Sequence, residues 1–403
     1  MGKFIFATGI ECSCPVIDGG RWRFDQLEVA GHYRHWQRDL ELVRELKLRF
    51  LRYGPPLYKI FQGPGKYDWS FMDEVAAAMR EQGIVPIMDL CHFGVPDWLD
   101  NFQNPELPKS LADYAEAFAR RYSWVQFYTP INEMYVTARL SALEGAWNEQ
   151  LRSEQAFVTA IRHLAKASVL IMEAIQRVRP DAIFINSESS EFYRACCPDP
   201  EIQRIADFEN QRRFIALDLV YANPVRADIR DYLLQHGMPA EEYTGFMSQR
   251  SAMRAVLGID YYIWNEKMIT PDGTIVALGE LFGWYVIAMQ YYERYRRVMM
   301  HTETNSQDAK EATDWLWRQW HNVGLIRESG VPVIGFTWYS LHDQVDWNIG
   351  LRKSLGNVNP VGLYDLNRDP RPVAEAYMSL VETNRDEHFS DDIKLPDGTP
   401  LEV

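Results

Sequence analysis

The sequence predicts an α/β protein folded as a single closed (β/α)8 barrel, also called a TIM barrel. Short apolar runs alternate with longer amphipathic runs along the 403-residue chain, in eight successive pairs. A barrel of this kind has a core of about 250 residues and grows by insertions in its loops, which suits the length of the chain. An open, doubly wound sheet is the alternative, but no glycine-rich phosphate loop follows the first apolar run, where the sequence reads TGIECSC.

The first half of the chain supplies four pairs of a strand and a helix. Each strand is a short apolar run, and each helix carries apolar residues at a spacing of three and four. The expected pairs are 3–9 with 33–47, 49–54 with 70–83, 84–93 with 110–123, and 125–133 with 154–178.

The second half repeats the same alternation. The expected pairs are 182–188 with 201–220, 256–263 with 281–296, 297–303 with 308–330, and 332–340 with 372–384. No linker or internal repeat interrupts the pattern, so we expect one barrel domain over residues 1–385 and a polar C-terminal tail at 386–403.

Composition and charge exclude several classes of partner. The net charge of −14 would repel nucleic acid and an anionic membrane surface. The chain has no apolar run of about 18 residues, and its first residues resemble a strand more than a signal peptide. The five cysteines are odd in number, which favours reduced thiols. We therefore expect a cytoplasmic protein without nucleic-acid or membrane partners, and these features are compatible with a homo-oligomer.

Aromatic residues favour a flat, neutral ligand, and nothing in the sequence favours a metal. Aromatic residues make up 13% of the chain, which is typical of surfaces that stack on sugar rings. Cys12, Cys14, Cys91 and His92 form the one conceivable metal cluster, but they lack the C-x-x-C spacing of zinc sites. We expect no metal and no cofactor.

Candidate catalytic groups are found where the predicted strands end, because barrels of this class carry their active sites at the carboxyl ends of the strands. Glu133 ends the fourth strand and Glu303 ends the seventh, so the two carboxylates are expected to face each other across the barrel mouth. Retaining glycosidases need such a pair about 5 Å apart. The full set of candidates at strand ends is Arg52, Asp89, His92, Asn132, Glu133, Glu188, Asp260, Tyr262, Glu303, Trp338, His342 and Asp343.

Six stretches between about residue 30 and about residue 377 resemble motifs of glycoside hydrolase family 1, the β-glucosidase family of retaining (β/α)8 enzymes. TPINE is similar to T-x-N-E-P, GIDYY to G-x-N-Y-Y, and HTETN to the region of T-E-N-G. HYRHWQRDLELVRELKLRFLRYG resembles H-Y-x-R-Y-x-E-D followed by L-x-x-R-F. PIMDLCHFGVPDWL resembles L-x-H-W-D-x-P-x-W-L, and GFTWYSLHDQVDW resembles W-S-x-x-D-N-x-E-W.

The resemblance implies a retaining β-glycosidase that hydrolyses a terminal β-glucoside-like or β-galactoside-like sugar through a covalent glycosyl-enzyme. Glu303 is implied as the nucleophile and Glu133 as the acid/base, with Arg52 and Tyr262 holding Glu303. The other implied substrate-binding residues are His92, Asn132 at the sugar 2-hydroxyl, Trp338 as the stacking platform, and Asp346 and Trp347 as ligands of the glycone.

The chain also departs from the family pattern. Met134 stands where the family has a proline, Phe93 where it has a tryptophan, and Asp346 where it has a glutamate, and the spacing from the platform tryptophan to this acid is one residue longer. The N-terminal glutamine that grips sugar hydroxyls has no clear counterpart, and Glu11 or Asp18 are its candidate substitutes. These departures affect the expected choice of sugar more than the expected chemistry.

Several alternatives stay open from the sequence. A neighbouring carboxylate, Glu293 or Glu311, could be the true partner of Glu133. A transglycosidase would use the same covalent intermediate, and a 6-phospho-β-glycosidase would use Arg352 and Lys353 to bind the phosphate. A non-catalytic carbohydrate-binding barrel is the alternative from another functional class.

Overall fold

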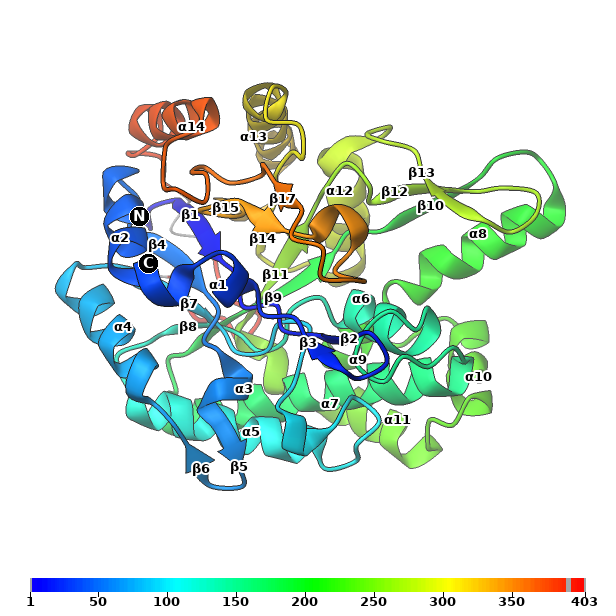
Figure 1. The fold of residues 1–403 in the computed structure, drawn as a ribbon. Coiled ribbons are helices and arrows are strands. Elements are labelled where there is room, and N and C mark those ends of the chain that lie inside the picture. The colour runs from blue at the N-terminus through cyan, green and yellow to red at the C-terminus, as the bar shows by residue number, and fades with distance from the viewer. Residues whose placement is uncertain (1, 389–392, 402–403) are drawn as a thin grey trace.

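The computed structural model describes residues 2–388 and 393–401 and shows a closed eight-stranded barrel (Figure 1). Neighbouring strands pair in parallel and follow one another around the barrel in chain order, which confirms the predicted fold class and all eight expected strands. The barrel strands are β1 (Ile5–Ile10), β4 (Phe50–Tyr53), β7 (Val85–Asp89), β8 (Phe127–Thr129), β9 (Ile183–Ser189), β11 (Ala255–Asp260), β14 (Met299–Glu303) and β15 (Val333–Trp338).

Helices surround the barrel on its outer face (Figure 1). Ser153 shows how one of them begins, because its hydroxyl oxygen accepts the backbone N–H of Ala156 and caps α7 at its N-terminus. The expected helix at 201–220 is divided into two, α8 and α9. The principal helices are α2 (His32–Glu45), α4 (Ser70–Glu81), α5 (Leu107–Arg121), α7 (Glu154–Val178), α8 (Pro200–Arg212), α9 (Ile215–Val220), α12 (Gly283–Tyr295), α13 (Ala312–Glu328) and α14 (Pro372–Thr383).

Two apolar layers form on the two faces of the strands, because successive side chains of a strand point to opposite faces. The outer layer packs the strands against the helices. The inner layer fills the barrel at the amino ends of its strands and leaves the carboxyl ends to polar groups. The strand residues of the inner layer are Ile5, Ala7, Phe50, Ile87, Phe127, Ile183, Ile185, Val256, Met300 and Ile334.

The C-terminal segment belongs partly to this inner layer. Leu395 and Leu401 are 3% and 4% exposed and pack into the inner cluster, and Asp397 forms an ion pair with Arg254 at 3.1 Å. The expectation of a polar tail over 386–403 is therefore wrong for residues 393–401, because two widely spaced leucines are enough to anchor the segment. Residues 389–392 and 402–403 of that range lie outside the described residues.

The loops carry additional elements that the sequence did not predict. A small sheet, β10 (Phe192–Ala195), β12 (Glu266–Ile269) and β13 (Ile275–Ala277), extends from the barrel beside α8 (Figure 1). No helix among the described residues has both the length and the apolar character to span a membrane. The remaining elements are α1 (Gln26–Val29), α3 (Leu57–Ile60), α6 (Met134–Ala138), α10 (Ala227–Gln235), α11 (Ala240–Ser248), β2 (Val16–Ile17), β3 (Trp22–Arg23), β5 (Phe61–Gly63), β6 (Lys66–Tyr67), β16 (Gln344–Val345) and β17 (Val358–Asn359).

Candidate active site

A cavity of about 350 Å³ lies at the carboxyl ends of the barrel strands. Its lining comes from segments that follow different strands, so residues distant in sequence meet there. Residues Glu11, His92, Glu133, Tyr262, Glu303 and Trp347 all line this cavity. The two glutamates singled out in the sequence therefore share one cavity.

Glu303 is held at both of its carboxylate oxygens. Arg52 of β4 is 1% exposed and donates from Nη1 to Oε1 of Glu303. The hydroxyl of Tyr262 donates to Oε2 at 2.7 Å. Glu303 is thus fixed in orientation at the end of β14 and faces the cavity.

The second guanidinium nitrogen of Arg52 continues the network under the cavity. Nη2 of Arg52 donates to Asp89 at 2.9 Å and to Oδ1 of Asn132 at 2.5 Å. Because this fixes the amide of Asn132, its Nδ2 faces and donates to Nε2 of His92 at 3.1 Å. Nδ1 of His92 then donates to Asp89 at 2.7 Å. Arg52, Asp89, His92, Asn132 and Glu303 form a continuous buried network, which we call the floor of the cavity.

Glu133 lies between β8, which ends at Thr129, and α6, which begins at Met134, and it is 7% exposed. Its backbone has a φ of 39° in the left-handed region, and its N–H donates to the carbonyl of Ser187 at 3.0 Å, which fixes the residue where α6 begins. Burial raises the pKa of Glu133 well above its usual range, and the nearby carboxyls of Asp260 and Glu303 raise it further. A raised pKa favours the protonated form of this carboxyl, which can donate its proton to a ligand.

The strand end around Tyr262 shows which of two adjacent tyrosines faces the site. Tyr261 points away from the cavity, where its hydroxyl donates to Glu266 at 2.8 Å and its ring stacks on Trp315. Tyr262 points to the opposite side and reaches Glu303. The alternation of a strand places only one of the two in the cavity.

Comparison with known proteins assigns the family. The profile of the family described as glycosyl hydrolase family 1 matches residues 22–225, just over half of the chain. The chain belongs to glycosyl hydrolase family 1. It is therefore a glycoside hydrolase, as the motifs led us to expect.

Individual relatives of this family 1 chain are distant in sequence but similar in length. β-Glucosidase A of Thermotoga maritima is 21% identical over 396 residues, which cover 88% of this chain and 87% of that protein. Aryl-phospho-β-D-glucosidase BglA of Bacillus subtilis is 21% identical over 428 residues, which cover 89% of this chain and 87% of that protein. The solved structure of the family 1 β-glucosidase from Thermotoga maritima superposes with a TM-score of 0.79 at 17% identity, covering 95% of this chain and 99% of that one, and shows the same fold.

Glu11 and Trp347 meet at one end of the cavity. Nε1 of Trp347 donates to Glu11 at 2.8 Å, and Nε2 of Gln344 donates to the other oxygen of Glu11. Asp18, the other substitute considered for the missing glutamine, lies on the exposed β2–β3 turn and pairs with Arg21 at 2.8 Å. Of the two candidates, only Glu11 reaches the cavity of this family 1 chain.

Trp338 is wrongly placed for the expected sugar platform. It is fully buried in the outer layer, and its Nε1 donates to the carbonyl of Val361 at 3.1 Å. The next residue, Tyr339, turns inward instead: its ring lies parallel to that of His92 at 6.3 Å and beneath the guanidinium of Arg52 at 5.3 Å. The longer spacing to the following acid was the signal in the sequence that the motif is displaced by one residue.

Asp346 is likewise wrongly placed as a ligand of the glycone. Its carboxylate accepts the backbone N–H groups of Leu355, Gly356 and Asn357 at 2.8–2.9 Å, so its oxygens are occupied in closing the loop. The shorter side chain, compared with a glutamate, is satisfied by its own loop. The same loop places Trp347 in the cavity lining.

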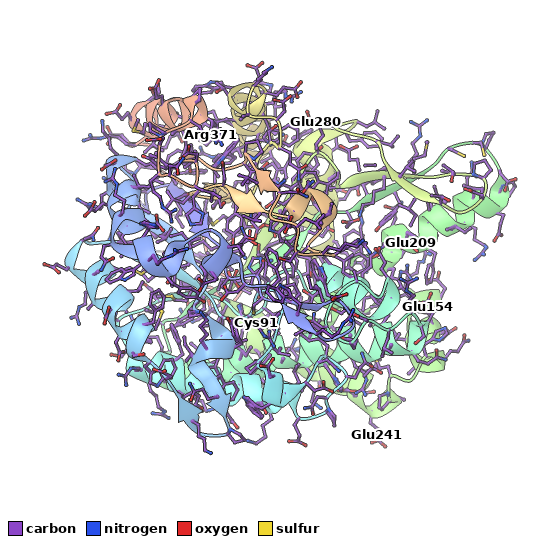
Figure 2. All side chains as sticks on the ribbon, viewed as in Figure 1. Cys91, Glu154, Glu209, Glu241, Glu280 and Arg371 are labelled. Atoms are coloured by element: carbon purple, nitrogen blue, oxygen red, sulfur yellow. The ribbon has the colours of Figure 1, made fainter. Side chains whose placement is uncertain are left out.

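Charged residues from the loops form the outer wall of the cavity, and sequence reasoning missed them. Arg139 donates to Glu144 at 2.8 Å, and Lys267 on β12 forms an ion pair with Glu191. Arg139 also forms an ion pair at 3.4 Å with Glu209 of α8, and Figure 2 labels Glu209. These residues lie in inserted loops that match none of the motifs considered above, so the sequence carried no signal for them. We call Arg139, Glu144, Glu191 and Lys267 the outer wall.

The other carboxylates considered as partners of Glu133 lie elsewhere. Glu293 is exposed on α12, and Glu311 is exposed directly before α13. Both are absent from the lining of the cavity that Glu133 and Glu303 share.

Two clusters of potential metal ligands lie outside or at the edge of the cavity. Cys12, Cys14 and Cys91 are buried free thiols. Among the described residues, one group of three side chains has its potential ligand atoms close enough together to share a metal ion. It consists of His32, Asp39 and His342. Arg368 donates to both oxygens of Asp39 at 2.9 and 3.1 Å, so this group connects α2 to the C-terminal loop.

Proposed function

We propose that this family 1 glycoside hydrolase is a retaining β-glycosidase that cleaves a terminal β-linked sugar, with Glu303 as the nucleophile and Glu133 as the acid/base. The observation that carries the proposal is the contrast between the two carboxyls of one cavity. Glu303 has both oxygens fixed by Arg52 and Tyr262, whereas Glu133 is buried among acids that raise its pKa. One is thereby suited to attack and the other to give a proton.

In the first step, an oxygen of Glu303 attacks the anomeric carbon of the sugar and forms a glycosyl ester. The bond from that carbon to the leaving oxygen breaks, and Glu133 transfers its proton to this oxygen, so the aglycone leaves as an alcohol. Arg52 and Tyr262 present the carboxylate in one orientation, which favours attack without a rearrangement of the side chain.

In the second step, water attacks the anomeric carbon and Glu133 takes a proton from it, while the ester bond to Glu303 breaks. The charge of Glu303 raises the pKa of Glu133 in the free enzyme. Esterification removes that charge, so the pKa of Glu133 falls and the same group can act as a base. The mechanism returns both carboxyls to their starting states.

The floor of the cavity and the side chain of Trp347 would hold the sugar. Nδ2 of Asn132 uses one N–H on His92, and its second N–H is suited to the sugar 2-hydroxyl, where hydrogen bonds strengthen in the transition state. His92 and Trp347 both line the cavity and supply further contacts to the glycone. The β-glucosidase names among the relatives support a β-glucoside-like sugar for this chain as well, and a β-galactoside-like sugar is the alternative.

The test is trapping of the covalent intermediate with a panel of activated 2-fluoro-2-deoxy-β-glycosides, followed by peptide mass mapping. The expected result is a single label on Glu303, with the reactive sugar identifying the class of glycone. The Glu303→Gln variant serves as the control and should take no label. A label on another carboxylate would disprove the assignment, and the absence of a label from every sugar would favour a carbohydrate-binding barrel without catalysis.

A further inference from the structure

Glu11 is a buried carboxylate that faces the cavity and has only neutral donors. It follows β1, is 3% exposed and lines the cavity. Among the described residues, its hydrogen bonds come from the indole N–H of Trp347 at 2.8 Å and the amide of Gln344. Neither donor carries a charge that would balance the carboxylate.

The other acids of the cavity are balanced differently. Glu303 is paired with Arg52, Glu144 with Arg139, and Glu191 with Lys267. The nearby basic side chain of His92 is already committed through Nδ1 to Asp89. Glu133 is the proton donor of the proposed mechanism, so Glu11 is left as the one lining carboxylate of the described chain with no basic side chain among its hydrogen-bond and ion-pair partners. Burial raises the pKa of Glu11, and the nearby His92 opposes that rise.

The structure argues against two other sets of sugar-binding residues that the sequence suggested. Asp346 does not line the cavity, and its carboxylate accepts three backbone N–H groups of its own loop. Arg352, which could have bound a phosphate, donates to Glu144 at 2.6 Å, and neither it nor Lys353 lines the cavity. Among the described residues, the Arg and Lys side chains that line the cavity are already paired, Arg139 with Glu144 and Lys267 with Glu191.

A ligand that displaces water from Glu11 must supply hydrogen-bond donors, because an ionised carboxylate only accepts. Sugar hydroxyls or an ammonium group satisfy this condition. A phosphate or carboxylate on the sugar would instead bring like charges together in a site where water screens them poorly.

We propose that Glu11 determines the charge of the sugar that this enzyme accepts: it admits glycones that are neutral or carry an ammonium group, and it rejects anionic ones. The kinetic test of this proposal rests on the proposed function, because the proposal names the substrate class of the same site. Glu11 acts on the glycone and takes no part in the bond-breaking steps.

The experiment compares 4-nitrophenyl β-glucoside with analogues that carry an amino group at C3, C4 or C6, a 6-phosphate, or a C6 carboxylate. For the wild-type chain, kcat/KM should be at least about tenfold higher on the neutral glucoside than on either anionic analogue. In Glu11→Gln, this preference should shrink by about tenfold or more, and the best amino analogue should lose more than the neutral glucoside does. Asp18→Asn removes the same charge outside the cavity and should leave every ratio unchanged.

Equal loss on all substrates in Glu11→Gln would show a merely structural role and overturn the proposal, as would a wild-type chain that prefers an anionic sugar. Failure of the proposed function is recognised separately, by the absence of 2-fluoro labelling and of turnover. In that case, calorimetric binding of glucose, 6-amino-6-deoxyglucose and glucose 6-phosphate decides the charge preference. The phosphate should bind the weakest to wild type and gain at least about tenfold relative to glucose in Glu11→Gln, and unchanged relative affinities would refute the role of Glu11.

Discussion

The floor and the outer wall of the cavity are both networks of charged residues, but they are built in different ways. The floor residues Arg52 and Glu303 lie in barrel strands and are almost fully buried, with hydrogen bonds that define one geometry. In the wall, Lys267 and Glu144 come from inserted elements and are partly exposed to solvent. Barrel register thus fixes the floor, whereas loops set the wall, so we expect chemistry to depend on the floor and substrate choice on the loops.

The largest effect is expected from Glu303→Gln, because the variant keeps the shape of the floor and removes the nucleophile. We expect kcat/KM to fall by about 10⁴-fold or more on aryl glycosides. Glu311→Gln, an exposed glutamate before α13, is the matched control and should keep wild-type kinetics. If the activity of Glu303→Gln stayed within tenfold of wild type, the chemistry would not depend on this residue of the floor.

Glu133→Gln is expected to give the next largest loss, and its size should depend on the leaving group. Substrates with poor leaving groups need the proton and should lose about 10²–10⁴-fold in rate, whereas those with good leaving groups should be relatively spared. Added azide should restore part of the activity, since it attacks the glycosyl-enzyme without a base. Equal losses on both kinds of substrate would exclude the acid/base role.

The pH dependence provides a second measurement on Glu133. Activity requires the protonated acid, and burial together with Asp260 and Glu303 raises the pKa of Glu133. The alkaline limb of kcat/KM should therefore lie well above the ordinary pKa of a glutamate, because rate is lost only as pH rises through the raised value. In Glu133→Gln this limb should disappear. A limb that persists unchanged would assign it to another group.

Tyr262→Phe tests a single hydrogen bond of the floor and should have a smaller effect. Loss of the bond to Glu303 is expected to lower kcat by about tenfold, which corresponds to ~1.4 kcal/mol. The neighbouring Tyr261→Phe removes an equivalent hydroxyl that bonds Glu266 outside the cavity. It should lower the free energy of unfolding by about 1 kcal/mol and leave kcat unchanged. If the two variants had equal kcat, Tyr262 would not act on Glu303.

The sequence predicted the barrel and the floor well, for a shared physical reason. Alternating apolar runs define strands, and strand ends in a closed parallel barrel must converge, so Arg52, Asn132, Glu133 and Glu303 were all among the candidates at the strand ends, and the resemblance to family motifs singled them out. Tyr262 has a neighbour, Tyr261, with the same side chain, and only the direction in which each points separates the two.

Residues beyond the strand ends were predicted less well, because loop geometry is set by contacts that have no period in the sequence. The carboxylate of Asp346 is consumed by backbone amides about ten residues later, and Trp338 differs from Tyr339 only in the side of the strand it faces. The C-terminal leucines Leu395 and Leu401 were missed because a polar composition concealed two anchoring side chains.

The smallest effect is expected at the rim of the wall, in Arg352→Met. Arg352 pairs with Glu144 in a half-exposed ion pair, a kind of contact worth about 0–1 kcal/mol, and Arg139 continues to hold Glu144. Turnover of neutral glycosides should therefore stay within about twofold of wild type. The 6-phospho analogue should also be unaffected, because Arg352 lies outside the cavity lining. A loss of about tenfold or more on that substrate alone would reassign Arg352 to phosphate binding and bring the wall into substrate recognition.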